Sequence, residues 1–475
     1  MLTRGGFANG QGERFDRQMK TEQTRMYITE PERRTPIAGQ VDVIVAGAGP
    51  AGIAAAVSAA RNGASVQILE AHGCLGGIWT AGLLTWMFEM DQPGIPREIS
   101  RRLGQMGARI GIRSDMYAYD PEAMKALLED LCAEAGVGFQ VHTRVAGVLA
   151  HGDRLSAVLT ESKSGRQAWR ASSFVDASGD GDLAAFAGCG YDLGREVSGE
   201  CQPMTYMALA TVPDVERLRP FISGGDLSNH LEAVNRLLVE IRRAGIEPSY
   251  SRPTLFQVRG NLLAVMVNHE YGVSATDALA ITRATVRARK EVNAVVRGLR
   301  RLGGAWADMF LVATCEQIGV REGRRIHGLY TVTKDDLAAG RRHADAVCRV
   351  SFGIDVHCTN PTAGNGQESP PVKMKPYDIP LRALIAKDVP NLLLAGRCIS
   401  GDFTAHSSYR VTGTAAATGQ AAGAVAALSV RRGKCPAEIP WPDTAEALQK
   451  SVWLEPAGSG DSPGLAPDPQ RGALV

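Results

Sequence analysis

The 475-residue sequence lacks the cysteine patterns of metal centres and redox disulfides. Its nine cysteines are odd in number and none forms a CxxC pair, which fits neither a disulfide framework nor an iron–sulfur, zinc or thioredoxin-like site. No apolar run approaches the roughly 18 residues that span a bilayer. The first 40 residues also lack the apolar core of a secretory signal. We therefore expect no metal, no membrane insertion, and a cytoplasmic protein with reduced thiols.

Net charge is nearly absent as well. The chain has 52 Lys and Arg against 50 Asp and Glu, a formal net charge of +2, so it has no global field that attracts nucleic acid or anionic membranes. This balance favours a small-molecule substrate and no nucleic-acid partner. One exception is the Arg-rich run from Ala275 to Leu302, which we interpret as the solvated or oligomer-facing side of a helix. An RNA-binding face is the alternative.

Residues 41–70, VDVIVAGAGPAGIAAAVSAARNGASVQILE, have the pattern of a strand, a tight turn, a small-residue helix and a second strand. In the turn, Gly47 permits the sharp bend, Gly49 lets the backbone approach a pyrophosphate, and Gly52 lets helix and strand pack closely. Phosphates then meet free N–H groups at the helix N-terminus. Glu70 ends the second strand, where a carboxylate accepts ribose hydroxyls. The stretch predicts a dinucleotide site and leaves NAD and FAD both open.

The length of the chain predicts two connected domains rather than one. Residues 71–118 look rich in loops, and residues 121–135 predict a helix that begins after a capping Asp120 and stops at Gly136. A strand and a small antiparallel meander then lead to FVDASGDGD. From about residue 195 to 375, the strand-like stretches MTYMALATV, LLAVMVN and MFLVA alternate with helices.

A late segment decides between the two dinucleotides. It reads NLLLAGRCISGDFTAHSSYRVTGTAAATGQAAG and predicts a strand to Ala395, a polar loop and a long helix of small residues. FAD, unlike NAD, extends beyond its pyrophosphate into a ribityl chain and a flavin that must also be held. A helix that starts between Tyr409 and Gly413 directs its positive N-terminus at the flavin pyrimidine edge and stabilises the reduced ring. The sequence therefore predicts FAD.

We expect an α/β fold in which a Rossmann-like FAD-binding domain with a three-stranded meander carries an inserted α+β substrate domain. The expected parts are an N-terminal extension (1–38), a discontinuous FAD-binding domain (39–195 and 376–435), the inserted domain (196–375) and a partly disordered tail (436–475).

Five segments, taken in order, resemble the FAD-dependent oxidoreductases of the glutathione-reductase-like flavin fold, in the branch that has a single nucleotide-binding domain. They are DVIVAGAGPAGIAAAVSAARNGASVQILE, LGGIWTAGL, FVDASGDGDLAAFAG, GVREGRRIHGLY and the late segment above. The resemblance covers roughly residues 35–435. It implies hydride transfer between the flavin N5 and a small polar substrate, in a cleft between the two domains. Trp79 stands where family members often have a smaller residue, so the identity of the substrate does not transfer.

The resemblance also implies which residues contact FAD. They are Gly47, Gly49, Pro50, Ala51 and Gly52 at the pyrophosphate, Glu70 at the ribose, Gly77 and Thr80 along the cofactor, Val145 at the adenine through its backbone, Ala177, Ser178 and Gly179 over the ADP half, and Gly396, Arg397, Asp402, Thr412 and Gly413 at the ribityl chain and flavin.

Two histidines are candidates for proton transfer beside the flavin, since this step at neutral pH calls for a group such as His. His406 lies between the late strand and the flavin-facing helix, and His357 follows a predicted strand in FGIDVHCTN. A structural histidine that bonds a loop carbonyl is an equally weighted alternative for each.

Several residues are candidates to hold an anionic substrate. They are Arg321, which we group with the catalytic histidines, and Arg324, Arg410 and Tyr409. The alternative for any one arginine is an ion pair with Glu322 or with a carboxylate between the domains.

Two other functions remain open at this point. A tRNA-modifying flavoprotein shares the N-terminal pattern, although the balanced charge and the short chain after the last FAD helix speak against it. A non-redox flavoprotein, such as a hydratase or lyase, is the second. The chain has no second GxGxxG and no redox CxxC, which argues against a pyridine-nucleotide disulfide reductase. The electron acceptor is left open, and so is assembly into a homo-oligomer.

Overall fold

The structure is a computed structural model that describes residues 28–111, 113–224, 229–361 and 366–451. The described residues from 37 onward form one compact unit, and the elements below belong to it. The division of this unit into FAD-binding and inserted domains stays a prediction. Most of the tail lies outside the described residues.

A five-stranded parallel sheet forms the centre of the unit. Its strands, in spatial order, are β20 (Leu392–Leu394), β11 (Ser173–Asp176), β2 (Val43–Ala46), β3 (Val66–Leu69) and β7 (Gly138–Gln140). Every residue of β2 and β11 is buried, as expected when helices or further strands cover both faces of a parallel sheet. The predicted Rossmann-like α/β fold is confirmed.

The helices of the described ranges lie around this sheet and, for α6 and α7, beside the second sheet described below. They are α2 (Pro50–Arg61), α3 (Ile95–Gln105), α4 (Pro121–Ala135), α5 (Asp182–Phe186), α6 (His230–Arg243), α7 (Ala278–Arg301), α8 (Lys334–Ala339), α9 (Phe403–Tyr409), α10 (Thr412–Arg432) and α11 (Trp441–Lys450). None of the helices in the described ranges is long and apolar enough to cross a membrane.

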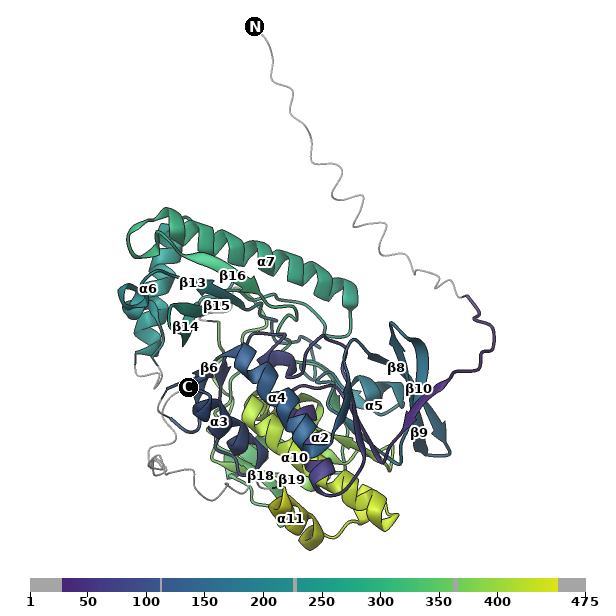
Figure 1. Cartoon of the computed structure of the whole chain (residues 1–475). Coiled ribbons are helices and arrows are strands. Elements are labelled where there is room, and N and C mark those ends of the chain that lie inside the picture. Colours follow the sequence, from purple (N-terminus) through teal and green to yellow (C-terminus); the bar gives the residue numbers. More distant parts are fainter. Residues whose placement is uncertain (1–27, 112, 225–228, 362–365, 452–475) are drawn as a thin grey trace. The chain divides into compact units, whose positions relative to one another are not determined.

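Helices α2 and α10 pack side by side at the centre of the unit (Figure 1). A Cβ atom built on Gly419 of α10 would lie 2.0 Å from the carbonyl oxygen of Ala51, and one on Gly423 would lie 1.9 Å from that of Ala55. Both pairs are spaced by one helical turn, so small residues face each other along the contact. The early and late segments of the sequence therefore meet through backbone rather than side chains.

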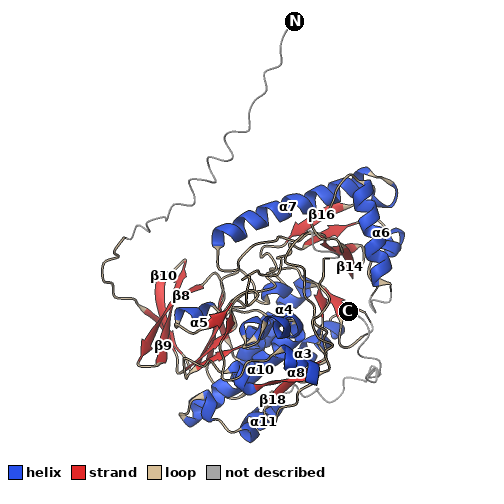
Figure 2. Ribbon diagram, turned by 180° about the vertical axis from the view of Figure 1, so that it is seen from behind, coloured by secondary structure: helices blue, strands red, loops and turns tan. Residues whose placement is uncertain are grey.

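The predicted meander forms on one side of the unit (Figure 2). Strands β8 (Arg144–His151), β9 (Arg154–Ser162) and β10 (Gly165–Arg170) pair antiparallel in chain order. Strand β1 (Ile37–Gln40), which crosses the predicted boundary between the extension and the FAD-binding domain at residue 38, adds parallel to β10.

A second sheet of four antiparallel strands has its own hydrophobic core. Its order is β14 (Thr254–Arg259), β15 (Leu262–Met266), β13 (Ala208–Thr211) and β16 (Phe310–Thr314). The long helix α7 runs beside β16, with α6 near its far end (Figure 1). Three of its strands, β13, β15 and β16, overlap the predicted strand-like stretches MTYMALATV, LLAVMVN and MFLVA.

The remaining strands are short. They are β4 (Trp86–Met87), β5 (Arg109–Ile110), β6 (Tyr117–Tyr119), β12 (Tyr191–Asp192), β17 (Arg325–Ile326), β18 (Ala346–Val350) and β19 (Tyr377–Pro380).

Residues 71–118 consist mostly of turns and loops, as expected, but they also contain helix α3, which buries Ile95, Ile99 and Leu103 along one face and was not predicted. One local expectation is wrong, because no strand leads to His357. Residues 352–358 form a loop. The N–H of His357 donates to the side-chain oxygen Gln202 Oε1 at 2.9 Å and not to a neighbouring strand.

Candidate active site

The predicted FAD-contacting residues gather at the carboxyl edge of the parallel sheet, where α/β proteins bind nucleotides. Gly47 follows β2 with a φ of 94°, and a Cβ there would lie 2.6 Å from the carbonyl oxygen of Ala177, the residue after β11. A Cβ on Gly52 would lie 1.9 Å from Gly47 O. These two glycines are therefore required by the protein's own backbone.

Gly49 is different. A Cβ on this residue meets no described atom within 4 Å, and its φ of −66° suits any residue. The chain itself thus gives no packing or conformational reason for a glycine at this position. A close-lying ligand such as a pyrophosphate supplies one.

Both central helices begin without a side-chain cap in the described structure. Gly49 precedes α2 and Val411 precedes α10, and neither side chain accepts from the first helical N–H groups. At the start of α10, the hydroxyls of Thr412 and Thr414 are buried and have no partner among the described residues. The N–H of Gly413 donates to the Phe88 carbonyl at 3.1 Å, so the two threonine hydroxyls are the groups left without a described partner there. They fit the polar flavin edge of FAD, and the uncapped start of α2 fits its phosphates.

Other predicted FAD contacts already have partners in the protein. Glu70 accepts from Ala48 N at 2.6 Å and from His72 N at 2.8 Å, which leaves further lone pairs on its carboxylate. Asp402 caps α9 through Ala405 N at 2.7 Å and also accepts from Lys334 N at 2.7 Å. The hydroxyl of Thr80 donates to the Leu75 carbonyl. Their roles toward FAD stay predictions.

The remaining predicted contacts lie around the same edge. Pro50 and Ala51 begin helix α2, and Gly77 and Gly396 pack against Gly49 and Ala51, respectively. Val145 lies on strand β8, and Ser178, shortly after β11, donates to Asp176. Gly179 packs against the guanidinium of Arg397, and Gly413 packs against the backbone of Phe88 and Glu89. Segments roughly 350 residues apart in the sequence therefore form one site.

A cluster of arginine and histidine side chains adjoins this edge. Arg410 lies between α9 and α10, and its Nη2 donates to the Asp355 carbonyl at 2.6 Å and to Gln202 Oε1 at 3.2 Å. Arg321 donates through Nη1 to Pro203 O at 2.8 Å. Arg397, in the late segment that follows β20, donates to the carbonyl of Val320 at 3.1 Å. This hydrogen bond places the late segment next to Arg321, the following residue.

Asp355 and His357 form a pair within this cluster, with His357 Nε2 3.1 Å from Asp355 Oδ2. Burial and the charge of Arg321 lower the pKa of His357 to about 4, although Asp355 opposes the shift. Burial raises the pKa of Asp355, but the positive charges of His357, Arg410 and Arg321 outweigh it and hold that pKa well below its ordinary value. At neutral pH the pair is therefore an ionised carboxylate and a neutral imidazole.

His269 belongs to the same cluster, although the sequence analysis did not single it out. Its ring stacks on Tyr250 with centroids 3.9 Å apart and meets the ring of His357 edge-on at 4.9 Å. Burial, together with the charge of Arg321, lowers its pKa well below the ordinary value. A usable signal existed, since His269 directly follows the predicted strand LLAVMVN at the end of a sheet.

The other candidates lie apart from this pair or have internal partners. His406 on α9 is fully buried, neither ring nitrogen has a partner among the described residues, and burial with the charges of Arg325 and Arg410 lowers its pKa. Tyr409 donates to Ile399 O at 3.1 Å. Arg324 donates to Asp182 Oδ1 at 2.9 Å and to the Asp180 carbonyl. The structure thus brings together His357, Arg321 and Arg410, and not Arg324.

Residues 42–452 match the model of the family described as FAD dependent oxidoreductase. The chain belongs to this family of FAD-dependent oxidoreductases. The match spans both cofactor-holding segments and the second sheet, and it confirms the predictions of family, FAD cofactor and enzymatic class.

Individual relatives are more distant. Thiamine thiazole synthases of Methanococcus maripaludis and Methanococcus vannielii are 28% and 27% identical over 171 and 172 residues. Each match covers 34% of this chain and less than two thirds of the relative, 64% and 65%.

Among solved structures, a geranylgeranyl bacteriochlorophyll reductase-like protein of Thermoplasma acidophilum is 12% identical with a TM-score of 0.42, over 87% of this chain and 82% of its own. A flavin-dependent brominase is 13% identical with a TM-score of 0.42, over 86% and 83%.

Proposed function

We propose that this FAD-dependent oxidoreductase transfers a hydride between FAD and a small polar, anionic organic substrate. Arg321 and Arg410 bind the anionic group, and His357 exchanges a proton with the reacting group. The observation that carries the proposal is the meeting of two partly buried arginines with an Asp–His pair, next to the N-terminus of α10. When bound, FAD supplies an acceptor or donor of hydride at its N5.

The arginines supply more positive charge than the cluster neutralises. Two guanidinium groups, on Arg321 and Arg410, face the one carboxylate of Asp355, while the nearby Glu322 is paired with Arg325. Burial lowers the pKa of Arg410 to about 10, so it stays charged at neutral pH. Excess charge held partly out of water is costly unless a partner offsets it, and an anionic substrate is such a partner.

Both arginines also keep N–H groups available. Nε and Nη2 of Arg321, and Nε and Nη1 of Arg410, make no hydrogen bond with described residues. Guanidinium groups with free N–H pairs bind carboxylates in a bidentate way, which fixes the substrate's orientation as well as its position.

His357 is suited to accept a proton. Asp355 accepts from Nε2–H, which leaves the lone pair on Nδ1, a buried atom without a partner in the described chain. Its low pKa keeps it neutral, and therefore competent as a base, across the physiological range. His406 remains the alternative proton acceptor.

The test is anaerobic addition of small metabolites to the purified yellow holoenzyme, with bleaching of the flavin absorbance as the readout. We expect carboxylates or phosphates to bleach it and neutral analogues, NADH and NADPH to do so poorly. Arg321→Gln is expected to weaken substrate affinity roughly 10- to 100-fold, and His357→Asn to slow bleaching by about 10²- to 10⁴-fold.

The matched control is Arg382→Gln, because Arg382 pairs with Asp345 away from this cluster. It should leave both quantities unchanged. Bleaching by neutral compounds alone, or an Arg321→Gln enzyme that behaves like the control, would show the proposal to be wrong.

Cellular location follows from the thiols. No disulfide joins two cysteines in the described part of the chain, and burial raises the pKa of most of the nine, for example that of Cys132 to about 12. Cysteines outside disulfides support the proposal that the enzyme works in the reducing cytoplasm.

A further inference from the structure

Two neutral histidines in the cluster are held in opposite tautomers. His357 donates from Nε2 to Asp355, so its lone pair is on Nδ1. His269 lies with Nδ1 3.3 Å from the hydroxyl of Tyr271, and that hydroxyl donates its only hydrogen to the carbonyl of Ser249 at 3.1 Å. Tyr271 must therefore accept from His269 Nδ1–H, and the lone pair of His269 is on Nε2.

Both lone-pair nitrogens are buried and lack a partner among the described residues. His269 is 2% exposed and His357 5% exposed, and their rings meet edge-on. A buried acceptor that bonds neither water nor protein costs free energy, and here two such acceptors lie next to each other. One hydroxyl group can donate to only one of them.

We infer that His269 is a second substrate-binding residue, and that the substrate is a carboxylate bearing two neighbouring hydroxyl groups. The inference rests on the proposed function and specifies its substrate. The carboxylate binds Arg321 and Arg410, one hydroxyl donates to His357 Nδ1, and the second donates to His269 Nε2.

The chemistry is the oxidation of the first hydroxyl to a carbonyl. Its O–H bond breaks and the proton goes to His357 Nδ1. The C–H bond on the same carbon breaks and its hydrogen leaves with both electrons to the oxidised flavin, while a C=O double bond forms. The second hydroxyl keeps its hydrogen, so His269 binds and orients without exchanging a proton.

The experiment measures equilibrium binding by calorimetry and by the shift of the oxidised flavin spectrum, so it does not depend on turnover. The probes are succinate, malate and tartrate, which differ only in having no, one or two hydroxyls, with propanoate, lactate and glycerate as the monocarboxylate series. We expect the wild-type holoenzyme to bind each series about tenfold more tightly per added hydroxyl.

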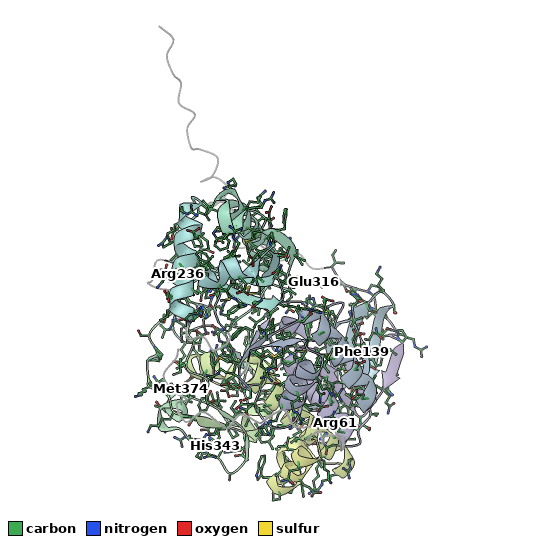
Figure 3. All side chains as sticks on the ribbon, turned by 60° about the vertical axis from the view of Figure 1, so that its left-hand side comes forward. Arg61, Phe139, Arg236, Glu316, His343 and Met374 are labelled. Atoms are coloured by element: carbon green, nitrogen blue, oxygen red, sulfur yellow. The ribbon has the colours of Figure 1, made fainter. Side chains whose placement is uncertain are left out.

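In His269→Phe, the second hydroxyl loses its acceptor, so tartrate is expected to bind about as weakly as malate does in the wild type. The matched control is His343→Phe. His343 also has a buried ring nitrogen without a described partner, but it lies just before β18 and packs against Tyr330. Figure 3 labels His343 near the lower end of the molecule, below Met374. The control variant should keep the full preference for tartrate.

The binding of the two anion series by the wild-type holoenzyme tests the two-hydroxyl substrate even if a variant loses FAD or stability. Equal binding of succinate, malate and tartrate, with Arg321→Gln still abolishing it, would overturn the two-hydroxyl substrate and leave the proposed function intact. A preference for tartrate that survives His269→Phe would remove His269 from the site. If none of the six anions binds, both the inference and the proposed function fail.

Discussion

Replacing Gly419 with alanine is expected to push helix α10 away from α2. The new Cβ would lie 2.0 Å from the carbonyl oxygen of Ala51, whereas ordinary van der Waals contact begins at 3.4 Å, so the helices must separate by about 1.4 Å. Overpacking of this kind costs about 1–3 kcal/mol of folding free energy. A clash with backbone costs an amount near the upper end of this range, because a backbone atom cannot relieve it by changing rotamer. The gain in helix propensity from Gly to Ala offsets about 1 kcal/mol. A net loss of about 2 kcal/mol in the free energy of unfolding follows.

The same substitution at Gly104 is the control. Gly104 lies on α3, and a Cβ there meets no described atom within 4 Å, so only the propensity gain of about 0.5–1 kcal/mol applies. Urea unfolding of the FAD-free proteins should therefore give shifts of opposite sign for the two variants.

Gly419→Ala is also expected to weaken FAD binding by about tenfold or more, because Ala51 belongs to the helix end that we predict to bind the pyrophosphate, and a shift near 1 Å disrupts such geometry. Titration of the apoprotein with FAD measures it. If Gly419→Ala stabilises the protein as Gly104→Ala does, or leaves FAD affinity unchanged, then close packing of α2 and α10 does not set the cofactor site.

Three further predictions concern stability, pH and the cofactor. Gly49→Leu should abolish FAD binding but leave the free energy of unfolding of the apoprotein nearly unchanged. Gly52→Ala should lower that free energy by about 1–3 kcal/mol, because its Cβ would lie 1.9 Å from a carbonyl oxygen. Arg325→Met should destabilise by about 3–5 kcal/mol, since it leaves the fully buried carboxylate of Glu322 unpaired, and adding Glu322→Gln should recover much of the loss in thermal melts. Because the folded pKa of His357 is lowered from 6.5 to about 4, the neutral ring contributes stability that is fully present above pH 6.5 and is lost as pH falls toward 4. Unfolding of the wild type against His357→Gln should show roughly 3 kcal/mol of this loss across that window, and a flat difference would contradict the pKa.

Local sequence signals predict correctly those helices whose ends are marked by capping residues. The predicted helix over residues 121–135 is α4, with Asp120 accepting from Glu122 N at 2.9 Å and Gly136 ending it at a φ of 70°. Helix α3 was overlooked because Gly94 caps it without a side chain, although Ile95, Ile99 and Leu103 were a readable signal at spacings of four.

Long-range contacts explain what sequence reasoning could not reach. The meeting of the early and late segments at the carboxyl edge of the parallel sheet could be predicted, because each segment has a strand, a turn and a helix in order. His269, Asp355 and Gln202 come from a sheet end and two loops with no periodic pattern, and only the folded chain brings them next to Arg410. The Tyr271 hydroxyl that fixes the tautomer of His269 is likewise visible only as a contact.

Asp355 joins the two functions proposed for the cluster. Its Oδ2 accepts from His357, which fixes the proton acceptor, and its carbonyl accepts from Arg410, which fixes one of the anion-binding groups. Its Oδ1 accepts from Gln367 Nε2 at 2.7 Å, so the carboxylate cannot turn without breaking several bonds. Since both Arg410 and His357 depend on this single residue, the distance from the anion to the accepted proton is set by one loop, and substrates of a different length are expected to bind without reacting.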